Sequence, residues 1–255
     1  MLDPETRRMC REMGVPGLLE ALDMVCEDPS YAALAFEDKV KVVIDYAHQE
    51  MSNKRVASLL RSAHLRMPQA DISNIDYEGR PLSRELVLSL GTSQFVDTAT
   101  DILLQGFSGT GKSHLACALG KQACKNGYRT LYVRTPDMLE YRAERIEAGW
   151  SEGKVIGRFA PYKVLILDEF LIDVPSTEEI HFLLELTERR YDCSSTIYCS
   201  QHGTDEWHRR LGGGAHAEAI LDRIVHNCMR IEMGSVNMRE RISKTRGASE
   251  DTARE

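Results

Sequence analysis

The chain has 255 residues, of which 42% are hydrophobic and 28% are charged, and its formal net charge is −7 at pH 7. This is the composition of an ordinary globular protein. The net negative charge excludes a protein that binds nucleic acid with its whole surface, but it allows one local basic face. No apolar run approaches the roughly 20 residues that are needed to cross a bilayer, so we expect no membrane-spanning segment.

The seven cysteines include no C-x-x-C pair, which argues against a zinc site. The first residues, MLDPETRRMCREMG, contain no apolar core of a signal peptide. Reduced thiols are typical of proteins in the cytoplasm. The sequence therefore predicts a cytoplasmic globular protein.

Residues 1–75 predict a small all-helical domain, because apolar residues recur at helical spacing and strand alternation is absent. Two such groups follow one another, namely Val42, Val43, Tyr46 and Ala47, and then Val56, Leu59, Leu60 and Ala63. We expect one long helix or a broken helical hairpin here. It should end at Met67-Pro68, because proline cannot continue a helix and restrains the residue before it.

A basic segment lies at the end of this helical region, where residues 51–70 contain no acidic residue. Its cations are Lys54, Arg55, Arg61 and Arg66. On a helix that turns about 100° per residue, the second apolar group occupies one side and these cations cover the opposite arc. Such a stripe suits the phosphates of DNA, because each neutralised phosphate releases counterions. The alternative is a solvated face that packs against an acidic neighbour.

From about residue 82 onward, short apolar strands alternate with helices. The candidate strands are residues 101–105, 130–134, 163–168, 195–200 and 228–233. The helix after the first strand should stop at Gly127, and a later helix should start at Ser176, where Glu179 completes a capping box. This order predicts an α/β fold whose five-stranded parallel sheet carries helices on both faces. We assign residues 76–243 to this domain and residues 244–255 to a polar, frayed tail.

The segment from Gly106 to Ser113 matches the pattern G-x-x-x-x-G-K-[ST]. Its glycines let backbone N–H groups approach phosphate oxygens, and the following helix directs its positive end to the same place. Lys112 would reach the β- and γ-phosphates, and the hydroxyl of Ser113 would hold Mg²⁺. The strand before the loop and the helix after it favour a phosphate-binding loop over a simple glycine turn.

The predicted nucleotide contacts therefore include the whole loop and the first residues of its helix. They are Gly106, Phe107, Ser108, Gly109, Thr110, Gly111, Lys112, Ser113 and His114. The imidazole of His114 is expected to pack there rather than to react.

An acidic pair, Asp168 and Glu169, follows the apolar residues of the third strand. The end of a parallel strand lies beside the phosphate loop in a sheet of this kind, so the carboxylate of Asp168 can orient Mg²⁺. Glu169 is placed to polarise an attacking water molecule as a general base. The alternative is that the pair only ends a strand in solvent. Together with the loop, the pair favours hydrolysis of a nucleotide over binding alone. The sequence contains no N-K-x-D run, the motif that would indicate recognition of guanine.

Two arginines come after the last core elements, Arg223 in EAILDRIVHNC and Arg239 in SVNMRERI. An arginine beside a γ-phosphate spreads the charge of the transition state, and one from a neighbouring subunit makes hydrolysis depend on assembly. By spacing alone, each arginine is better explained as a helix cap or as a partner of a surface acid.

Three stretches resemble the IstB family of transposition ATPases, relatives of the DnaC helicase loaders in the AAA+ class. They are GFSGTGKSHLACALGKQACKNGYRTLYVRTPDML, LILDEF and SSTIYCSQHGTDEWHRR followed by AEAILDRIVHNCMRIEM. The residues before the sheet also resemble the DNA-binding appendage of that family. The resemblance implies an AAA+ fold with ATP and Mg²⁺ as cofactors.

The resemblance also implies a role for individual residues. Asp168 would be the magnesium carboxylate, Glu169 the hydrolytic base and Gln201 the first sensor of the γ-phosphate. Arg223 would be the finger that acts on a neighbouring subunit, and Arg239 the second sensor. The chain departs from the family pattern at Phe170, which no glycine closely follows, and at Gln201, where asparagine is common in the wider class.

The function that the resemblance implies is an ATPase that forms an ATP-dependent, helical homo-oligomer on double-stranded target DNA and assists a transposase. A helicase loader in replication initiation is the first alternative. It would prefer single strands, which bind by stacking on aromatic side chains as well as by charge, and the basic segment is poor in aromatics. The second alternative is a nucleotide-dependent scaffold without turnover, against which Glu169 argues.

Overall fold

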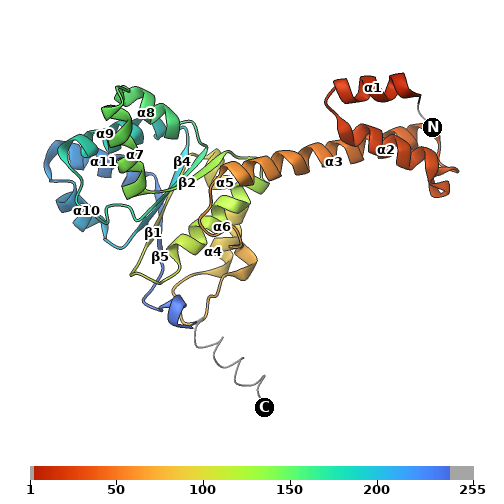
Figure 1. Ribbon diagram of the computed structural model, residues 1–255. Coiled ribbons are helices and arrows are strands. Elements are labelled where there is room, and N and C mark those ends of the chain that lie inside the picture. Colours follow the sequence, from red (N-terminus) through yellow and green to blue (C-terminus); the bar gives the residue numbers. More distant parts are fainter. Residues whose placement is uncertain (1–2, 242–255) are drawn as a thin grey trace, which may run out of the picture. The chain divides into compact units, whose positions relative to one another are not determined.

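The computed structural model describes residues 3–241, and these divide between two compact units, Met1–Ser58 and Leu59–Glu255. Each unit is described by itself (Figure 1). The predicted tail, residues 244–255, lies outside the described residues. Among the described residues, no helix is both long and apolar enough to cross a membrane.

The first unit is helical, as predicted for this part of the chain. Its elements are α1 (Pro4–Glu12), α2 (Pro16–Glu27), a short 3₁₀ turn (Pro29–Tyr31) and the first part of α3 (Phe36–Ser62). Ala21, Val25 and Val43 form a small buried cluster between α2 and α3. The two helices approach closely at Gly17, where an added Cβ would lie 2.8 Å from Cβ of Glu50. Glycine is therefore required at this crossing.

Helix α3 ends at Ser62, five residues before the predicted stop at Met67-Pro68. His64 adopts a left-handed φ of 51°, and the buried Ala63 accepts a hydrogen bond from the N–H of Tyr132 at 2.8 Å. The chain therefore leaves the helix to dock on the edge of the sheet, and this tertiary contact overrides local helix propensity.

The units divide after Ser58, whereas the sequence analysis placed the domain boundary after residue 75. Ala63, Ala70 and Ile75 are buried, and the latter two belong to the core on one face of the sheet. The segment that connects the two domains in the sequence therefore packs as part of the second unit.

The sheet of the second unit has five strands in the order β2-β3-β4-β1-β5, and every recorded pairing is parallel. The strands are β1 (Asp101–Gln105), β2 (Thr130–Arg134), β3 (Val164–Asp168), β4 (Ser195–Ser200) and β5 (Cys228–Glu232). They agree with the predicted segments to within one residue at each end. The predicted five-stranded parallel sheet is confirmed.

Helices cover both faces of this sheet (Figure 1). They are α4 (Arg84–Gly91), α5 (Gln94–Asp97), α6 (Lys112–Lys125), α7 (Thr135–Glu147), α8 (Glu152–Phe159), α9 (Thr177–Arg190), α10 (Thr204–Arg210) and α11 (Gly214–His226), with a 3₁₀ turn at Ile72–Asn74. Alternate residues of the strands point to opposite faces of the sheet and contribute to two separate hydrophobic cores. Ile102 and Ile166 pack with α4–α6 on one face, and Leu103 and Leu165 pack with α7–α11 on the other.

The local signals at the helix ends behave as predicted. Ser176 and Glu179 form the capping box that starts α9. Helix α6 gives way at Asn126 to Gly127, whose φ is 89°. The start of α9 therefore lies on the glycine-loop side of the sheet, and the end of α6 lies on the opposite side, where β2 begins.

Asp101 is the first residue of β1, at the end of this strand opposite the glycine loop, and it is 9% exposed. One of its carboxylate oxygens accepts the N–H of Thr196 at 2.6 Å. Burial raises the pKa of Asp101 to about 7, and both this hydrogen bond and the charge of the buried Arg190 oppose the shift. The folded protein therefore favours the protonated carboxyl.

We expect this residue to lower the free energy of unfolding as the pH rises from about 4, near the unfolded pKa, to about 7, and to have a constant effect above that. Asp101→Asn keeps an acceptor for Thr196 and removes the titration. From pH 4.5 to pH 8 the free energy of unfolding of the variant should rise by about 2–4 kcal/mol relative to that of the wild type. Urea unfolding at the two pH values measures this difference. An equal change in the free energy of unfolding of both proteins would contradict the prediction.

Candidate nucleotide site

The glycine loop connects β1 to α6 and has the backbone geometry that the sequence predicted. Gly109 and Gly111 adopt left-handed φ angles of 84° and 87°, which favour glycine. An added Cβ at Gly109 would lie 2.5 Å from Oδ1 of Asn237, so the loop is also closely packed from outside. The N–H of Met238 donates to the Gly109 carbonyl at 2.9 Å, which ties the end of the described chain to the loop.

Lys112 is the first residue of α6, and its side chain is folded into the loop. Its amino group donates to the carbonyl oxygens of Gly106 at 2.6 Å and Phe107 at 2.8 Å. Burial lowers the pKa of Lys112, since the residue is only 8% exposed. A phosphate group at this loop would offer the ammonium a stronger, charged acceptor than the two carbonyls.

Asp168 ends β3 with its side chain almost fully buried, at 2% exposure. The hydroxyl of Tyr132 donates to Oδ2 at 2.7 Å, and the N–H of Glu169 donates to Oδ1 at 3.0 Å. Burial and the bond to Asp168 raise the pKa of the Tyr132 phenol, which therefore stays a donor. The carboxylate is thus held rigidly at the edge of the sheet.

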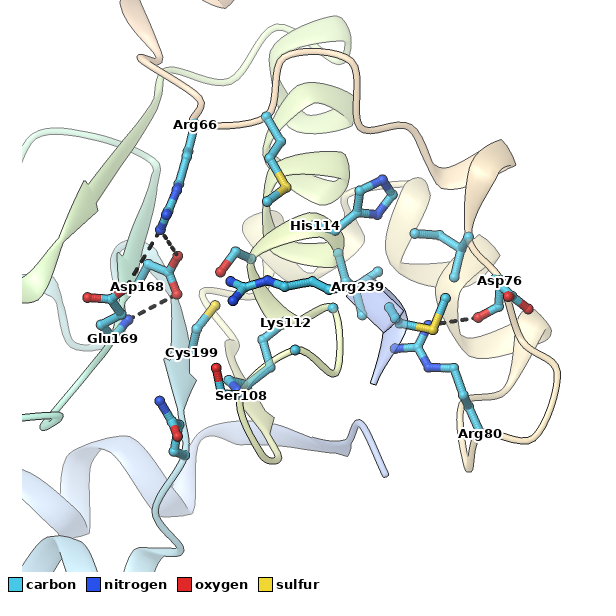
Figure 2. A pocket seen from close by; sticks show the side chains of 18 of the residues that line it. Arg66, Asp76, Arg80, Ser108, Lys112, His114, Asp168, Glu169, Cys199 and Arg239 are labelled. Carbon is cyan, nitrogen blue, oxygen red and sulfur yellow. Dashed lines mark hydrogen bonds and ion pairs between the residues drawn. The ribbon is translucent and has the colours of Figure 1, made fainter. Parts of the chain in front are cut away.

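Glu169 has a left-handed φ of 57°, and two arginines contact its carboxylate, of which Figure 2 shows Arg66. Arg134, at the end of β2, donates to Oε2 from Nε at 3.0 Å and from Nη2 at 2.6 Å. Arg66 approaches the other oxygen, with Nη1 3.6 Å from Oε1. The side chain of the predicted base is therefore oriented by a neighbouring strand.

Phe170, which follows the acidic pair, anchors this turn in the core. Its ring is buried against Tyr198 and Trp207, with centroid distances of 4.8 Å to each. The hydroxyl of Ser200 donates to the Phe170 carbonyl at 3.0 Å and accepts from Nε1 of Trp207 at 3.0 Å. These contacts fix the residue next to Glu169. This packing role of Phe170 could not be predicted from the sequence.

A cavity of about 420 Å³ lies between the loop, the end of β3 and the end of the described chain. It brings together the predicted residues Ser108, Gly109, Gly111, Lys112, Ser113, His114, Asp168, Glu169, Gln201 and Arg239. Burial, followed by the charge of Arg80, lowers the pKa of His114, which favours a neutral, packing imidazole. Gly106, Phe107 and Thr110 shape the loop but are not among the residues that line the cavity.

Arg80 is a site residue that the sequence analysis missed. Its Nη2 donates to the Thr110 carbonyl at 2.8 Å and its Nη1 donates to the Asp76 carbonyl at 2.7 Å. It therefore braces the glycine loop from the polar connector, and it lines the cavity. No spacing or motif marks this arginine, because the contact joins segments 30 residues apart.

Arg223 is not among the residues that line the cavity. It lies on α11, pairs with the carboxylate of Glu188 on α9, and donates from Nη1 to the Ala219 carbonyl at 2.9 Å. The chain therefore does not bring Arg223 into its own nucleotide site.

The predicted basic stripe is only partly a helical stripe. Lys54 and Arg55 lie on α3 in the first unit, and Lys54 pairs with Glu50 at 3.7 Å. Arg61 lies on the last turn of α3 and is exposed. Arg66 was expected on the same helix, and this placement is wrong. The helix ends at Ser62, and the side chain of Arg66 extends toward Asp168 instead.

The residues around the cavity fit Mg²⁺. The hydroxyl of Ser113 and the carboxylate of Asp168 both line it, and such hard oxygen ligands suit this ion. Magnesium usually takes only one or two protein ligands beside phosphate and water.

Comparisons with known proteins identify the family of the chain. The family model described as IstB-like ATP binding protein matches residues 9–246. The insertion sequence ATP-binding protein y4uH of Sinorhizobium fredii is 30% identical over 239 residues, which are 94% of this chain and 96% of that protein. The ATP-binding protein of insertion sequence IS1162 from Pseudomonas fluorescens is 32% identical over 203 residues, or 79% and 87% of the two chains.

Solved structures share the fold. The replication initiator DnaA bound to AMPPCP and single-stranded DNA matches with a TM-score of 0.58 at 22% identity, over 72% of this chain and 55% of that one. The DnaC helicase loader matches with a TM-score of 0.53 at 20% identity, over 65% and 97%. The second unit thus has the P-loop fold of the AAA+ class. Together with the family match along nearly its whole length, this means that the chain belongs to the IstB-like ATP-binding proteins of insertion sequences.

Proposed function

We propose that the protein is a magnesium-dependent ATPase that assembles on double-stranded target DNA and assists a transposase in transposition. The convergence of Lys112, Asp168 and Glu169 on one cavity beside the glycine loop carries the proposal. The names of the relatives, which are ATP-binding proteins of insertion sequences, support the link to transposition.

In this mechanism the loop N–H groups and Lys112 would bind the phosphates, and Ser113 and Asp168 would hold Mg²⁺. The ion would neutralise charge that develops on the β- and γ-phosphates. Glu169 accepts a proton from the attacking water, and Arg134 keeps its carboxylate oriented at Oε2. Gln201 and Arg239, which also line the cavity, contact the terminal phosphate as sensors.

Assembly is proposed because the site lacks a contribution from Arg223 of its own chain. That arginine pairs with Glu188 and is half-buried on α11. A neighbouring copy could insert its Arg223 at the γ-phosphate and thereby make hydrolysis depend on the oligomer. Binding of ATP then favours the assembled state through differential affinity.

A helicase loader remains the second candidate, since the DnaC loader has the same fold over 97% of its length. The similarity at 20% identity concerns the fold alone. The relatives that this chain matches at 30% or more are proteins of insertion sequences, and these favour transposition.

The hydrolytic base is tested with Glu169→Gln. The variant should bind ATP as well as the wild type, and its turnover should fall at least about 100-fold because the general base is lost. Equilibrium binding of a fluorescent ATP analogue and release of phosphate measure the two effects. Glu85→Gln, on the exposed first turn of α4, is the matched control and should retain full turnover. Unchanged turnover in Glu169→Gln would refute the assignment.

The arginine finger is tested by mixing two inactive variants, Lys112→Ala and Arg223→Ala. In an equal mixture, about one interface in four combines an intact loop with an intact finger, so about a quarter of the wild-type activity should return. Mixing Lys112→Ala with Glu169→Gln is the control, because both residues act in one site and no rescue should occur. Absence of rescue in the first mixture would assign Arg223 a role inside its own chain.

The DNA contacts are tested by replacing Lys54, Arg55 and Arg61 together with alanine. Each lost phosphate contact should reduce the slope of log K against log salt by about 0.9, so the slope should fall by about 2–3 on duplex DNA. Replacing the exposed cations Lys41, Arg84 and Arg209 provides a charge-matched control. An unchanged slope in the first triple variant would move the binding face elsewhere.

A further inference from the structure

We infer that Arg66 restrains the acidic pair: it competes with Mg²⁺ for Asp168 and must withdraw from Glu169 before this residue can act as the base. The inference rests on the proposed ATPase function and assigns to it a regulatory group from outside the sheet. Arg66 follows the end of α3 by four residues, in the segment that docks on the edge strand β2.

The guanidinium of Arg66 faces both catalytic carboxylates (Figure 2). Its Nη1 lies 3.6 Å from Oε1 of Glu169 and 4.0 Å from Oδ2 of Asp168. A hydrogen bond with Tyr132 is the largest of the causes that raise the pKa of Arg66. The positive charge is therefore kept between the two acids.

The two oxygens of Glu169 have different partners, and this difference defines the role of Arg66. Arg134 holds Oε2 through two hydrogen bonds, which leaves Oε1 as the oxygen that can accept a proton from water. Arg66 is the cation that faces Oε1. Arg134 therefore orients the base, whereas Arg66 lies next to Oε1, the oxygen that must accept the proton.

The same guanidinium competes for Asp168. A magnesium ion that shares this carboxylate would repel the guanidinium at short range, since both are positive. Asp168 is nearly inaccessible, but the side chain of Arg66 is 44% exposed and can swing into solvent. The flanking backbone does not need to move, because Ala63 and Ala70 are fully buried on either side.

The ion pairs of Arg66 with Glu169 and Asp168 are weak enough to break and form reversibly. An exposed ion pair of this kind is equivalent to about a two- to fivefold change in an equilibrium. Removing it should therefore lower the Mg²⁺ concentration for half-maximal binding of a non-hydrolysable ATP analogue by about two- to fivefold. It should also raise the single-turnover rate by a similar factor and leave the analogue's affinity at saturating Mg²⁺ unchanged.

The experiment compares Arg66→Ala with Arg66→Lys and with the control Arg84→Ala, which removes an exposed arginine from the first turn of α4. Mg²⁺ titrations of analogue binding are followed by fluorescence, and hydrolysis is followed in single turnover without DNA. We expect the shift in Arg66→Ala, a smaller shift in Arg66→Lys because lysine keeps the charge, and wild-type values in Arg84→Ala. An unchanged or higher Mg²⁺ requirement in Arg66→Ala would overturn the inference.

A second measurement needs no nucleotide and separates this inference from the proposed function. Phenylglyoxal modifies free guanidinium groups, and mass spectrometry gives the rate at Arg66 in the wild type and in Glu169→Gln. We expect faster modification at Arg66 in the variant, because its partner has lost its charge, and an equal rate at Arg61. Equal modification rates at Arg66 in the wild type and in Glu169→Gln would contradict the inference that Glu169 restrains Arg66. Failure of the wild type to bind the analogue would instead refute the ATPase proposal, and the modification result would still decide the restraint.

Discussion

The structure of the site depends on burying opposite charges at one edge of the parallel sheet. Asp168 and Lys112 are 2% and 8% exposed, and a buried charge is tolerated only with hydrogen-bond partners. The protein supplies these partners itself: Tyr132 of β2 for the carboxylate and two loop carbonyls for the ammonium. Phosphate and Mg²⁺ offer each group a charged partner, so the arrangement suits the ligands that we propose.

The fold provides this edge through its two cores. Strands β1, β3 and β4 pair in parallel, so their carboxyl ends lie together and present the glycine loop, the acidic pair and Gln201 to one cavity. Phe170 sits in the core on one face, and this fixes the strained turn at Glu169. The position of the base therefore depends on aromatic packing as much as on its own strand.

Elements outside the sheet complete the site. Arg80 and Arg66 come from the segment before β1, and Met238 contacts the loop from the end of the described chain. Because these contacts are few and polar, they can be exchanged at modest free-energy cost. The second unit thus surrounds a rigid phosphate site with replaceable contacts, which is the property that a nucleotide-dependent assembly needs.

The parts of the protein that depend on local patterns could be predicted from the order of residues. The five strands, the capping box at Ser176, the glycine loop and the acidic pair are all encoded within short segments whose spacing has a direct physical meaning. The order of strands and helices also predicted the three-layered packing, because buried parallel strands require helices on both faces.

The positions of the arginines depend on tertiary contacts and could not be predicted in this way. The periodicity around Arg66 continues past Ser62, so the sequence placed this residue on a basic stripe, but docking of Ala63 on Tyr132 ended the helix and turned the side chain toward Glu169. Arg80 and Arg134 likewise reach partners 30 and 35 residues away. A long, flexible cation acquires its role from the acid or carbonyl that the fold brings near it, and that proximity is not written in local spacing.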